Sequence, residues 1–541
     1  MLLRRLPRHL PQFKTTGVLK CRHNSTKSYY ITTPIFYPNA VPHIGHLYSL
    51  VVGDVFARYQ RLLDPNRPVK YLAGTDEHGL KIQKAAQTKG LPPDVFCDEL
   101  SDQFRRLSDK AQISHTRFMR TTERTHYEAV EYIWRALDAK GLIYKGDYSG
   151  WYSITDECFY TSAQVTPSTC PSTGNSTTIS IETGAVVEWH NEQNYMFKLS
   201  QFQESLLAHY TSNPRSIFPE QHHTHIVQIL SAPLEDLSIS RPRARLSWGV
   251  QVPDDPEHTI YVWFDALIVY LSGMGYPWKG TGAQEGWPVD LQIIGKDILR
   301  FHSIYLPAIL QALGLPLQKQ LLAHAHWTTE QKKMSKSLGN VADPFEAIEE
   351  FGIDIVRYYL ARIGGRFRDD VDWSREQLDK HNKELQSLLG NFFLRVTSKT
   401  IHTRMASAPP ISIQEVYSEA SSPNRALIDA QRALPENVRV SMDSMEVSDA
   451  LGSIIDLLRL ANKTITDTAP WKPDTTPAEA YAAHVVSVET LRVVGICLQP
   501  FVPKVAGKLL DALEIPVKER AWEFAGREGR SVKAVGVRLF Q

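Results

Sequence analysis

The chain has 541 residues, of which 43% are hydrophobic and 22% are charged, and its formal net charge is +1. This length is more than one compact core usually holds, and the composition is that of a folded globular protein, so we expect several domains and exclude a disordered chain. A net charge near zero also excludes a globally basic surface, so a nucleic-acid partner would have to bind local basic patches.

The amino-terminal segment differs in composition from the rest of the chain. It has no acidic side chain, and its basic side chains are Arg4, Arg5, Arg8, Lys14, Lys20, Arg22 and Lys27. An Arg-rich and acid-poor start is typical of a mitochondrial transit segment, so we predict import into the mitochondrial matrix. The alternative is a basic arm that contacts RNA.

A strand–helix–strand pattern follows the amino-terminal segment. Residues 29–33 are aromatic and β-branched and end at a proline, which predicts a buried strand. Apolar residues then recur at helical spacing over 45–62, and residues 69–73 form another short apolar run. Such a βαβ unit binds ligands at the carboxyl ends of its strands and the amino end of its helix.

The same order returns later in the chain, with a strand at 291–294, a helix at 297–313 and a strand at 321–325. Between the two units, residues 147–215 are rich in Ser, Thr, Gly and Asn, which predicts an inserted domain. We therefore predict an α/β fold: a Rossmann-like parallel sheet split by a small inserted domain and followed by a C-terminal α-helical bundle. The predicted parts are a transit segment (1–27), the first half of the catalytic domain (28–146), the insertion (147–215), the second half (216–345), a linking segment (346–379) and the helical domain (380–541).

The first chemical motif is His43-Ile44-Gly45-His46, at the predicted turn from strand to helix. Unpaired backbone N–H groups and the helix dipole favour phosphate there, and imidazoles can add donors on short side chains. Gly45 lets a nucleotide approach the backbone. The motif therefore predicts an ATP site, with two histidines that only cap the helix as the alternative.

The second motif is Lys333-Met334-Ser335-Lys336-Ser337, just after a predicted strand. Compact ammonium groups suit a triphosphate whose charge shifts as pyrophosphate leaves. A solvated basic loop is the alternative for the second motif alone. Both motifs would rarely occur by chance in one chain, so their presence together favours a functional role for each.

The two motifs resemble the HIGH and KMSKS signatures of the class I aminoacyl-tRNA synthetases. The resemblance implies an enzyme that forms an aminoacyl-adenylate from ATP accompanied by Mg²⁺ and then loads a tRNA. It also implies catalytic roles for His43, His46, Lys333 and Lys336, and an ATP site that includes Gly45 and Ser335.

Four further segments resemble the methionine enzymes of that family: residues 36–39, 74–79, 262–266 and 295–302. The resemblance implies L-methionine as substrate and methionine tRNA as partner. A thioether favours contact with aromatic ring edges, and a carboxylate suits an α-ammonium group. The methionine-binding residues implied are Ile35, Tyr37, Asp76, Trp263, Tyr270, Ile298 and His302.

In the predicted helical domain, Asn391, Arg395 and Trp471 resemble the anticodon-contacting residues of the methionine enzymes. An amide and a guanidinium can bond to base edges, and an indole can stack on a base. Asn391 and Arg395 are four residues apart, so they project from one helix face. The alternative is a solvated helix face beside a tryptophan that only packs.

Several absences are also predicted. The longest apolar stretch, Ile260 to Met274, is shorter than the roughly 20 residues that cross a bilayer, so we predict no membrane span. Many relatives bind zinc through cysteine pairs in the insertion, whereas Cys158 and Cys170 stand alone, so we expect no bound metal besides Mg²⁺ and no structural zinc. We expect a monomer, because the chain shows no appended dimerisation domain.

Two other functions stay open at this point. A synthetase for leucine, isoleucine or valine would share both signatures, although such enzymes usually carry a much larger editing insertion. A catalytically inactive RNA-binding relative would keep the fold, although the retained histidines and lysines of the two motifs argue against it.

Overall fold

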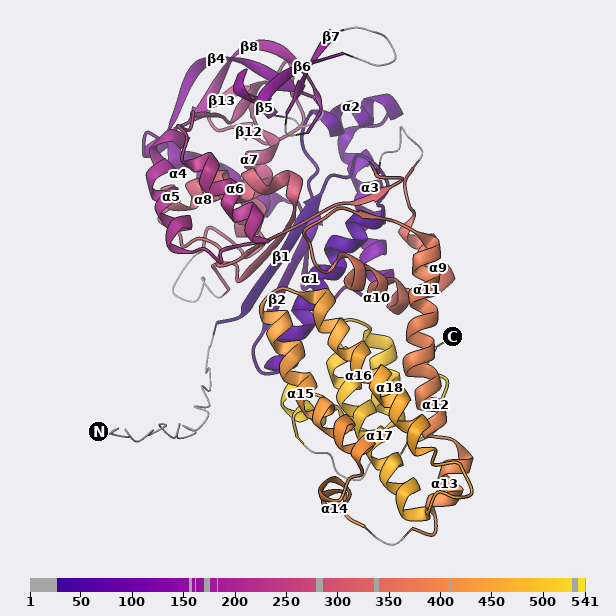
Figure 1. The fold of residues 1–541 in the computed structure, drawn as a ribbon. Helices are drawn as coiled ribbons and strands as arrows, with labels where there is room; N and C mark the ends of the chain where they lie inside the picture. The colour runs from indigo at the N-terminus through magenta and orange to yellow at the C-terminus, as the bar shows by residue number, and fades with distance from the viewer. Residues whose placement is uncertain are drawn as a thin grey trace, which may run out of the picture.

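The computed structural model describes residues 27–154, 158–160, 162–169, 176–181, 183–278, 286–334, 340–408, 411–527 and 534–540. Figure 1 shows three parts: a β-rich lobe, a parallel sheet with its helices, and an elongated helical bundle. The fold predicted from the sequence is confirmed in this arrangement.

The central sheet is parallel throughout and its six strands run in the order β3-β2-β1-β14-β15-β9. Strands from the two halves of the chain meet between β1 and β14, where the strand order reverses, and open α/β sheets bind ligands at such a point. The strands are β1 (Tyr29–Phe36), β2 (Val69–Thr75), β3 (Arg117–Arg120), β9 (Ile217–Phe218), β14 (Leu291–Gly295) and β15 (Leu321–His324).

Helices cover both faces of the sheet. On one face, α1 and α3 share an apolar core with α10 and the helical bundle, and on the other face α4 to α8 form a second core. The helices are α1 (Ile44–Leu63), α2 (Leu80–Lys89), α3 (Pro93–Lys110), α4 (Arg124–Ala139), α5 (Gln203–Ser212), α6 (Glu220–Leu230), α7 (Val262–Ser272) and α8 (Leu306–Leu313).

The segment predicted as one helix over 297–313 is broken into three pieces. A 3₁₀ turn, η3 (Lys296–Ile298), and a π-helical turn, η4 (Phe301–Tyr305), precede α8. Pro307 lies in the first turn of α8 and has no N–H to donate to the preceding turn, so a regular α-helix cannot run through it.

The inserted lobe is built on an antiparallel sheet in the order β5-β4-β8-β7-β6. Two smaller sheets are separate from this one, and one of them includes Lys333 of the second motif. Its strands are β4 (Ile143–Ser153), β5 (Cys158–Tyr160), β6 (Val165–Thr169), β7 (Ser176–Ser180) and β8 (Val186–Phe197), with β10 (Leu237–Ser238) paired to β8. The smaller sheets contain β11 (Ser240–Pro242), β12 (Gln251–Val252) and β13 (Asp255–Ile260), and β16 (Trp327–Thr329), β17 (Lys332–Lys333) and β18 (Val371–Asp372).

The helical bundle packs around α17, in which every residue from Val486 to Leu498 is buried. The other helices from the second motif onward are α9 (Pro344–Phe351), α10 (Ile353–Gly364), α11 (Arg375–Leu385), η6 (Gln386–Asn391), α12 (Phe392–Val396), α13 (Lys399–Met405), α14 (Ile413–Ser418), α15 (Ser422–Asp443), α16 (Val447–Thr468), α18 (Pro503–Ala512) and α19 (Trp522–Ala525).

Helix α17 (Pro477–Leu498) is long and apolar enough, by length and composition alone, to cross a membrane, but 83% of its most apolar window is buried against the rest of the protein. The sequence did not single it out, because His484, Glu489 and Arg492 interrupt its apolar run. In the bundle Glu489 and Arg492 form a buried ion pair, so α17 serves as the core helix of this domain.

Candidate functional site

The first motif forms the amino terminus of α1, beyond the carboxyl end of β1. Nδ1 of His43 accepts a hydrogen bond from the backbone N–H of Gly45 (3.0 Å), and Nδ1 of His46 accepts one from the N–H of His43 (3.0 Å). In the neutral rings the proton is therefore on Nε2, the nitrogen each ring can use as a donor. Burial and the neighbouring His43 lower the pKa of His46 well below its ordinary value, which keeps His46 neutral.

Gly45 has a structural reason to lack a side chain. A Cβ at this position would lie 2.9 Å from Cε1 and 3.0 Å from Nδ1 of His43. The caps use Nδ1 of each imidazole and orient both rings at the positive end of the helix dipole, where the phosphate site is predicted.

The chain just beyond the second motif lies next to the first motif. The backbone N–H of Ile44 donates to the carbonyl of Ala342 (3.1 Å), just beyond the motif, and Met334 is buried in the same core as Ile44 and Tyr48. Lys333 ends β17. The predicted residues Ser335 and Lys336 lie outside the described residues.

The residues predicted to bind methionine gather at the carboxyl ends of three neighbouring strands. Ile35 lies near the end of β1 and Tyr37 just beyond it, Asp76 follows β2, and Ile298 and His302 follow β14. Trp263 and Tyr270 are both on α7. All seven residues except Asp76 and His302 belong to or pack against one apolar core. The sheet thus brings together side chains that are separated by more than 250 residues.

A hydrogen-bonded pair lies in the core of this cluster. Nδ1 of His302 lies 2.9 Å from the carbonyl oxygen of Ile298 and must donate to it, so Nε2 accepts from the Tyr270 hydroxyl, 2.8 Å away. Burial lowers the pKa of His302 to about 4, which keeps the ring neutral near pH 7. Trp263 packs against Tyr305 with 5.1 Å between ring centroids.

The buried carboxylate of Asp265 contacts two histidines beside the candidate methionine site. Oδ2 of Asp265 lies 2.5 Å from Nδ1 of His78, and Oδ1 lies 2.6 Å from Nε2 of His126. Burial would raise the pKa of Asp265, but the two imidazoles more than offset it and lower the pKa to about 2. The carbonyl of His78 in turn accepts from the Tyr37 hydroxyl (2.8 Å).

No sequence pattern indicated a role for His126. It belongs to the buried face of α4 with Ala129, Val130 and Ile133, where its spacing is that of an ordinary core residue. Only the fold places His126 against Asp265, and Nδ1 of His126 also lies 2.7 Å from Oγ of Ser272.

The three residues predicted to bind the anticodon line one pocket of about 540 Å³ in the helical bundle, with Leu394, Ser398 and Thr400. The guanidinium carbon of Arg395 lies 5.0 Å from the centroid of the Trp471 ring, and Nη2 of Arg395 donates to Oγ1 of Thr466 (2.9 Å). Ala469, the left-handed cap that ends α16, turns the chain so that Trp471 reaches the pocket.

The zinc prediction falls largely outside the described part of the chain, since Cys170 and the side chain of Cys158 are not in it. Among the side chains that are described, no group of three or more His, Cys, Asp or Glu residues is placed to hold a metal ion.

Family models match nearly all of the chain beyond the amino-terminal segment. Residues 29–397 match the model described as "tRNA synthetases class I (M)", and residues 417–536 match the "Anticodon binding domain of methionyl tRNA ligase". The chain belongs to the class I tRNA synthetases of the methionine type. The family expected from the two signatures is confirmed.

Relatives and solved structures agree with this family. A protein of Neurospora crassa named "Probable methionine--tRNA ligase, mitochondrial" is 44% identical, over 92% of this chain and 82% of its own length. The human "Methionine--tRNA ligase, mitochondrial" is 41% identical over 94% of this chain and 88% of its own. The crystal structure of the Mycobacterium tuberculosis methionyl-tRNA synthetase with methionyl-adenylate superimposes with a TM-score of 0.86, at 37% identity, over 95% of this chain and all of the other.

Proposed function

We propose that the protein activates L-methionine with ATP and loads it onto methionine tRNA for translation in the mitochondrial matrix. The observation that carries this proposal is the gathering of the predicted methionine side chains at the carboxyl ends of β1, β2 and β14, beside the amino terminus of α1. Family membership supports the same reaction.

In the first step, a carboxylate oxygen of methionine attacks the α-phosphorus of ATP, and pyrophosphate leaves. Mg²⁺ enters with the nucleotide as part of the Mg·ATP substrate. We assign His43, His46 and the amino end of α1 to the phosphates, because the capping bonds orient both imidazoles at the positive end of the helix dipole, which favours phosphate. Lys333, Ser335 and Lys336 would meet the charge that grows on the leaving pyrophosphate.

We assign methionine to the cluster around Tyr270 and His302. The Tyr270 hydroxyl proton is committed to His302, so the methionine sulfur would contact the apolar and aromatic side chains around this pair, a surface that suits a thioether. The Asp76 carboxylate, 7% exposed at the end of β2, would receive the α-ammonium group.

The second step needs a tRNA that reaches from the active site to the pocket of Asn391, Arg395 and Trp471. There a base would stack on the indole, and the amide and guanidinium would bond to base edges. The terminal ribose hydroxyl then attacks the methionyl carbonyl, and AMP leaves.

Localisation and oligomeric state are part of the proposal. The basic, acid-free start of the chain and the mitochondrial names of similar proteins support import. We also propose a monomer, and light scattering of the purified protein measures this. We propose no membrane partner and no structural zinc; metal analysis of the purified protein tests the latter.

The deciding experiment is ATP–pyrophosphate exchange with purified protein and methionine, leucine, isoleucine or valine in separate reactions. We expect exchange that depends on methionine. Exchange with leucine, isoleucine or valine but not with methionine would overturn the substrate assignment, and no exchange with any of the four would favour an inactive RNA-binding relative.

A further inference from the structure

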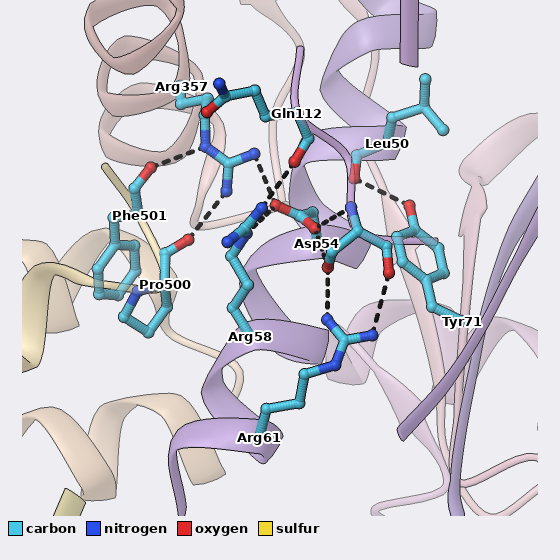
Figure 2. A network of polar contacts seen from close by, with 10 residues as sticks. Leu50, Asp54, Arg58, Arg61, Tyr71, Gln112, Arg357, Pro500 and Phe501 are labelled. Atoms are coloured by element: carbon cyan, nitrogen blue, oxygen red, sulfur yellow. Dashed lines mark hydrogen bonds and ion pairs between the residues drawn. The ribbon is translucent and has the colours of Figure 1, made fainter. Parts of the chain in front are cut away.

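A buried ion pair joins the catalytic sheet to the helical bundle. Arg357 on α10 and Asp54 on α1 are both fully buried, and Nη1 of Arg357 lies 2.7 Å from Oδ2 of Asp54 (Figure 2). Asp54 lies ten positions after Ile44, on the helix whose amino end carries the first motif. The carboxylate is therefore part of the element that presents His43 and His46.

The other nitrogens of Arg357 bind the helical bundle. Nε donates to the carbonyl of Phe501 and Nη2 to the carbonyl of Pro500, both at 2.9 Å. These carbonyls lie in the turn that joins α17 to α18, just past the end of α17, where the helix dipole is negative and favours a cation. One guanidinium thus bonds to α1 and to the end of α17 at once.

A second contact from α10 binds the same turn. Oδ2 of Asp354 accepts the backbone N–H of Val505 in the first turn of α18 (2.6 Å), where the dipole favours an anion. The two charged side chains of α10 therefore match the two helix ends that meet at the turn. An ion pair placed only to fill the core would not need this match.

Helix α17 connects this turn to the candidate anticodon pocket. It has 22 residues, so it is about 33 Å long. Near its amino end, Nδ1 of His484 lies 3.2 Å from the carbonyl of Val396, in the short helix that also carries Arg395. In Figure 1, α17 runs from α1 and α10 down to α13. A small change of angle at the turn would therefore move the pocket by several ångströms.

Besides Arg357, Asp54 has partners in the catalytic domain. Nε of Arg58 lies 2.6 Å from Oδ2 of Asp54, and the N–H and hydroxyl of Ser114 donate to Oδ1 at 2.7 and 2.5 Å. Arg58 also donates to the carbonyl of Gln112 (2.7 Å; Figure 2). These contacts orient the carboxylate independently of Arg357.

We propose that Arg357 is a positioning residue for tRNA charging: its ion pair with Asp54 and its bonds to Pro500 and Phe501 set the angle between the active site and the anticodon pocket. The inference rests on the proposed function. Arg357 touches no substrate. It acts by holding the two sites at the separation that one tRNA spans.

The test compares three measurements on Arg357→Lys. Lysine keeps the charge, but one ammonium cannot bond to both carbonyls and the carboxylate in the same geometry. We expect methionine-dependent pyrophosphate exchange and binding of an isolated anticodon stem-loop within about twofold of the parent. Charging of full-length methionine tRNA should fall about tenfold or more in kcat/KM. The control Arg58→Lys changes the other cation on Asp54, which does not reach the bundle, and should leave the ratio of charging to exchange unchanged.

The inference would be overturned if Arg357→Lys had the same ratio of charging to exchange as the parent, whether both rates are unchanged or both fall. If the variant fails to fold, Asp354→Ala tests the same turn against Asp354→Asn, whose amide oxygen can still accept from Val505. Unequal charging-to-exchange ratios in that pair are expected, and equal ratios would overturn the inference. Failure of the proposed function would appear in the parent, as absence of methionine-dependent exchange.

Discussion

The catalytic domain with its parallel sheet (the sheet half) and the helical bundle (the helical half) hold their candidate sites in different ways. In the sheet half, Tyr270, His302 and Asp265 are buried and each has a hydrogen-bond partner fixed by the fold. In the helical half, Asn391 is exposed and Arg395 and Trp471 are half-buried around an open pocket. A small substrate needs a site organised in advance, whereas an RNA loop brings bases that stack on a presented surface.

The largest expected effect is in the sheet half, at Lys336, which the KMSKS resemblance places where charge accumulates during adenylate formation. Removing a donor of this kind typically costs on the order of 100-fold or more in rate. Lys336→Ala should therefore slow methionine activation far more than it weakens methionine binding, as measured by single-turnover adenylate formation at several methionine concentrations. A parental activation rate would show that the assigned role is wrong.

A smaller effect is expected in the methionine cluster. Tyr270→Phe removes the donor to Nε2 of His302 and leaves a buried acceptor unpaired, which costs about 1–3 kcal/mol. We expect the KM for methionine in pyrophosphate exchange to rise by about tenfold, with no change in the KM for tRNA.

The matched control is Tyr71→Phe, which also removes a buried hydroxyl, but one that donates to the carbonyl of Leu50 on α1. Its methionine KM should stay near that of the parent. The same rise in both variants would mean that the Tyr270 hydroxyl supports the fold rather than the substrate.

Low pH should lower the folding stability of both halves, through different histidines. Burial lowers the pKa of His302 and His324 in the sheet half to about 4, and burial with the neighbouring His402 lowers that of His484 in the bundle to about 4. Below the ordinary pKa of 6.5 the unfolded chain binds protons that the folded protein does not. Stability should therefore be constant above about pH 6.5 and fall as the pH drops toward 4.

Each such histidine contributes on the order of 2 kcal/mol of destabilisation at pH 5. Urea unfolding of the parent and of His484→Gln at pH 7.5 and pH 5 measures this. We expect a smaller pH effect in the variant than in the parent. Equal pH effects would show that His484 is protonated in the folded protein as readily as in the unfolded chain.

The smallest effect is expected at the amino terminus. The backbone carbonyl of Lys27 accepts from Arg67 (3.1 Å) and its ammonium donates to the carbonyl of Pro288 (3.0 Å), so a deletion should stop before it. Removing residues 1–26 should leave exchange, charging and the melting temperature unchanged, while a fluorescent fusion loses mitochondrial uptake. Retained uptake would refute the targeting proposal.

The sequence predicted the sheet half well because local patterns determine it. Strands of one βαβ unit are short apolar runs, and the two signatures occupy turns whose position follows from those runs. The sequence left helix capping and phosphate binding as alternatives for His43 and His46, and only the structure shows that the caps through Nδ1 also orient the rings.

Contacts between distant segments lay beyond sequence reasoning. Asp54 and Arg357 are more than 300 positions apart, and each falls at a spacing that fits an ordinary helix face. The role of His126 could not be recognised for the same reason, because its position on α4 fits an ordinary buried helix face. The sequence predicted one helix over 297–313 rather than the three pieces around His302, because Pro307 alone does not indicate where a π-turn will form.

The central claim is that the two halves serve separate steps. Its most direct test compares the loss of tRNA charging with the loss of pyrophosphate exchange in Trp471→Ala. Stacking on an aromatic side chain is worth about 1–3 kcal/mol per base, so tRNA charging should fall roughly ten- to a hundredfold, while methionine-dependent pyrophosphate exchange, which needs no tRNA, should barely change. Leu394→Ala, in the same pocket but without an aromatic ring, should lose much less charging. Equal losses of charging and exchange in Trp471→Ala would contradict the account, because Trp471 would then support the fold and not the anticodon.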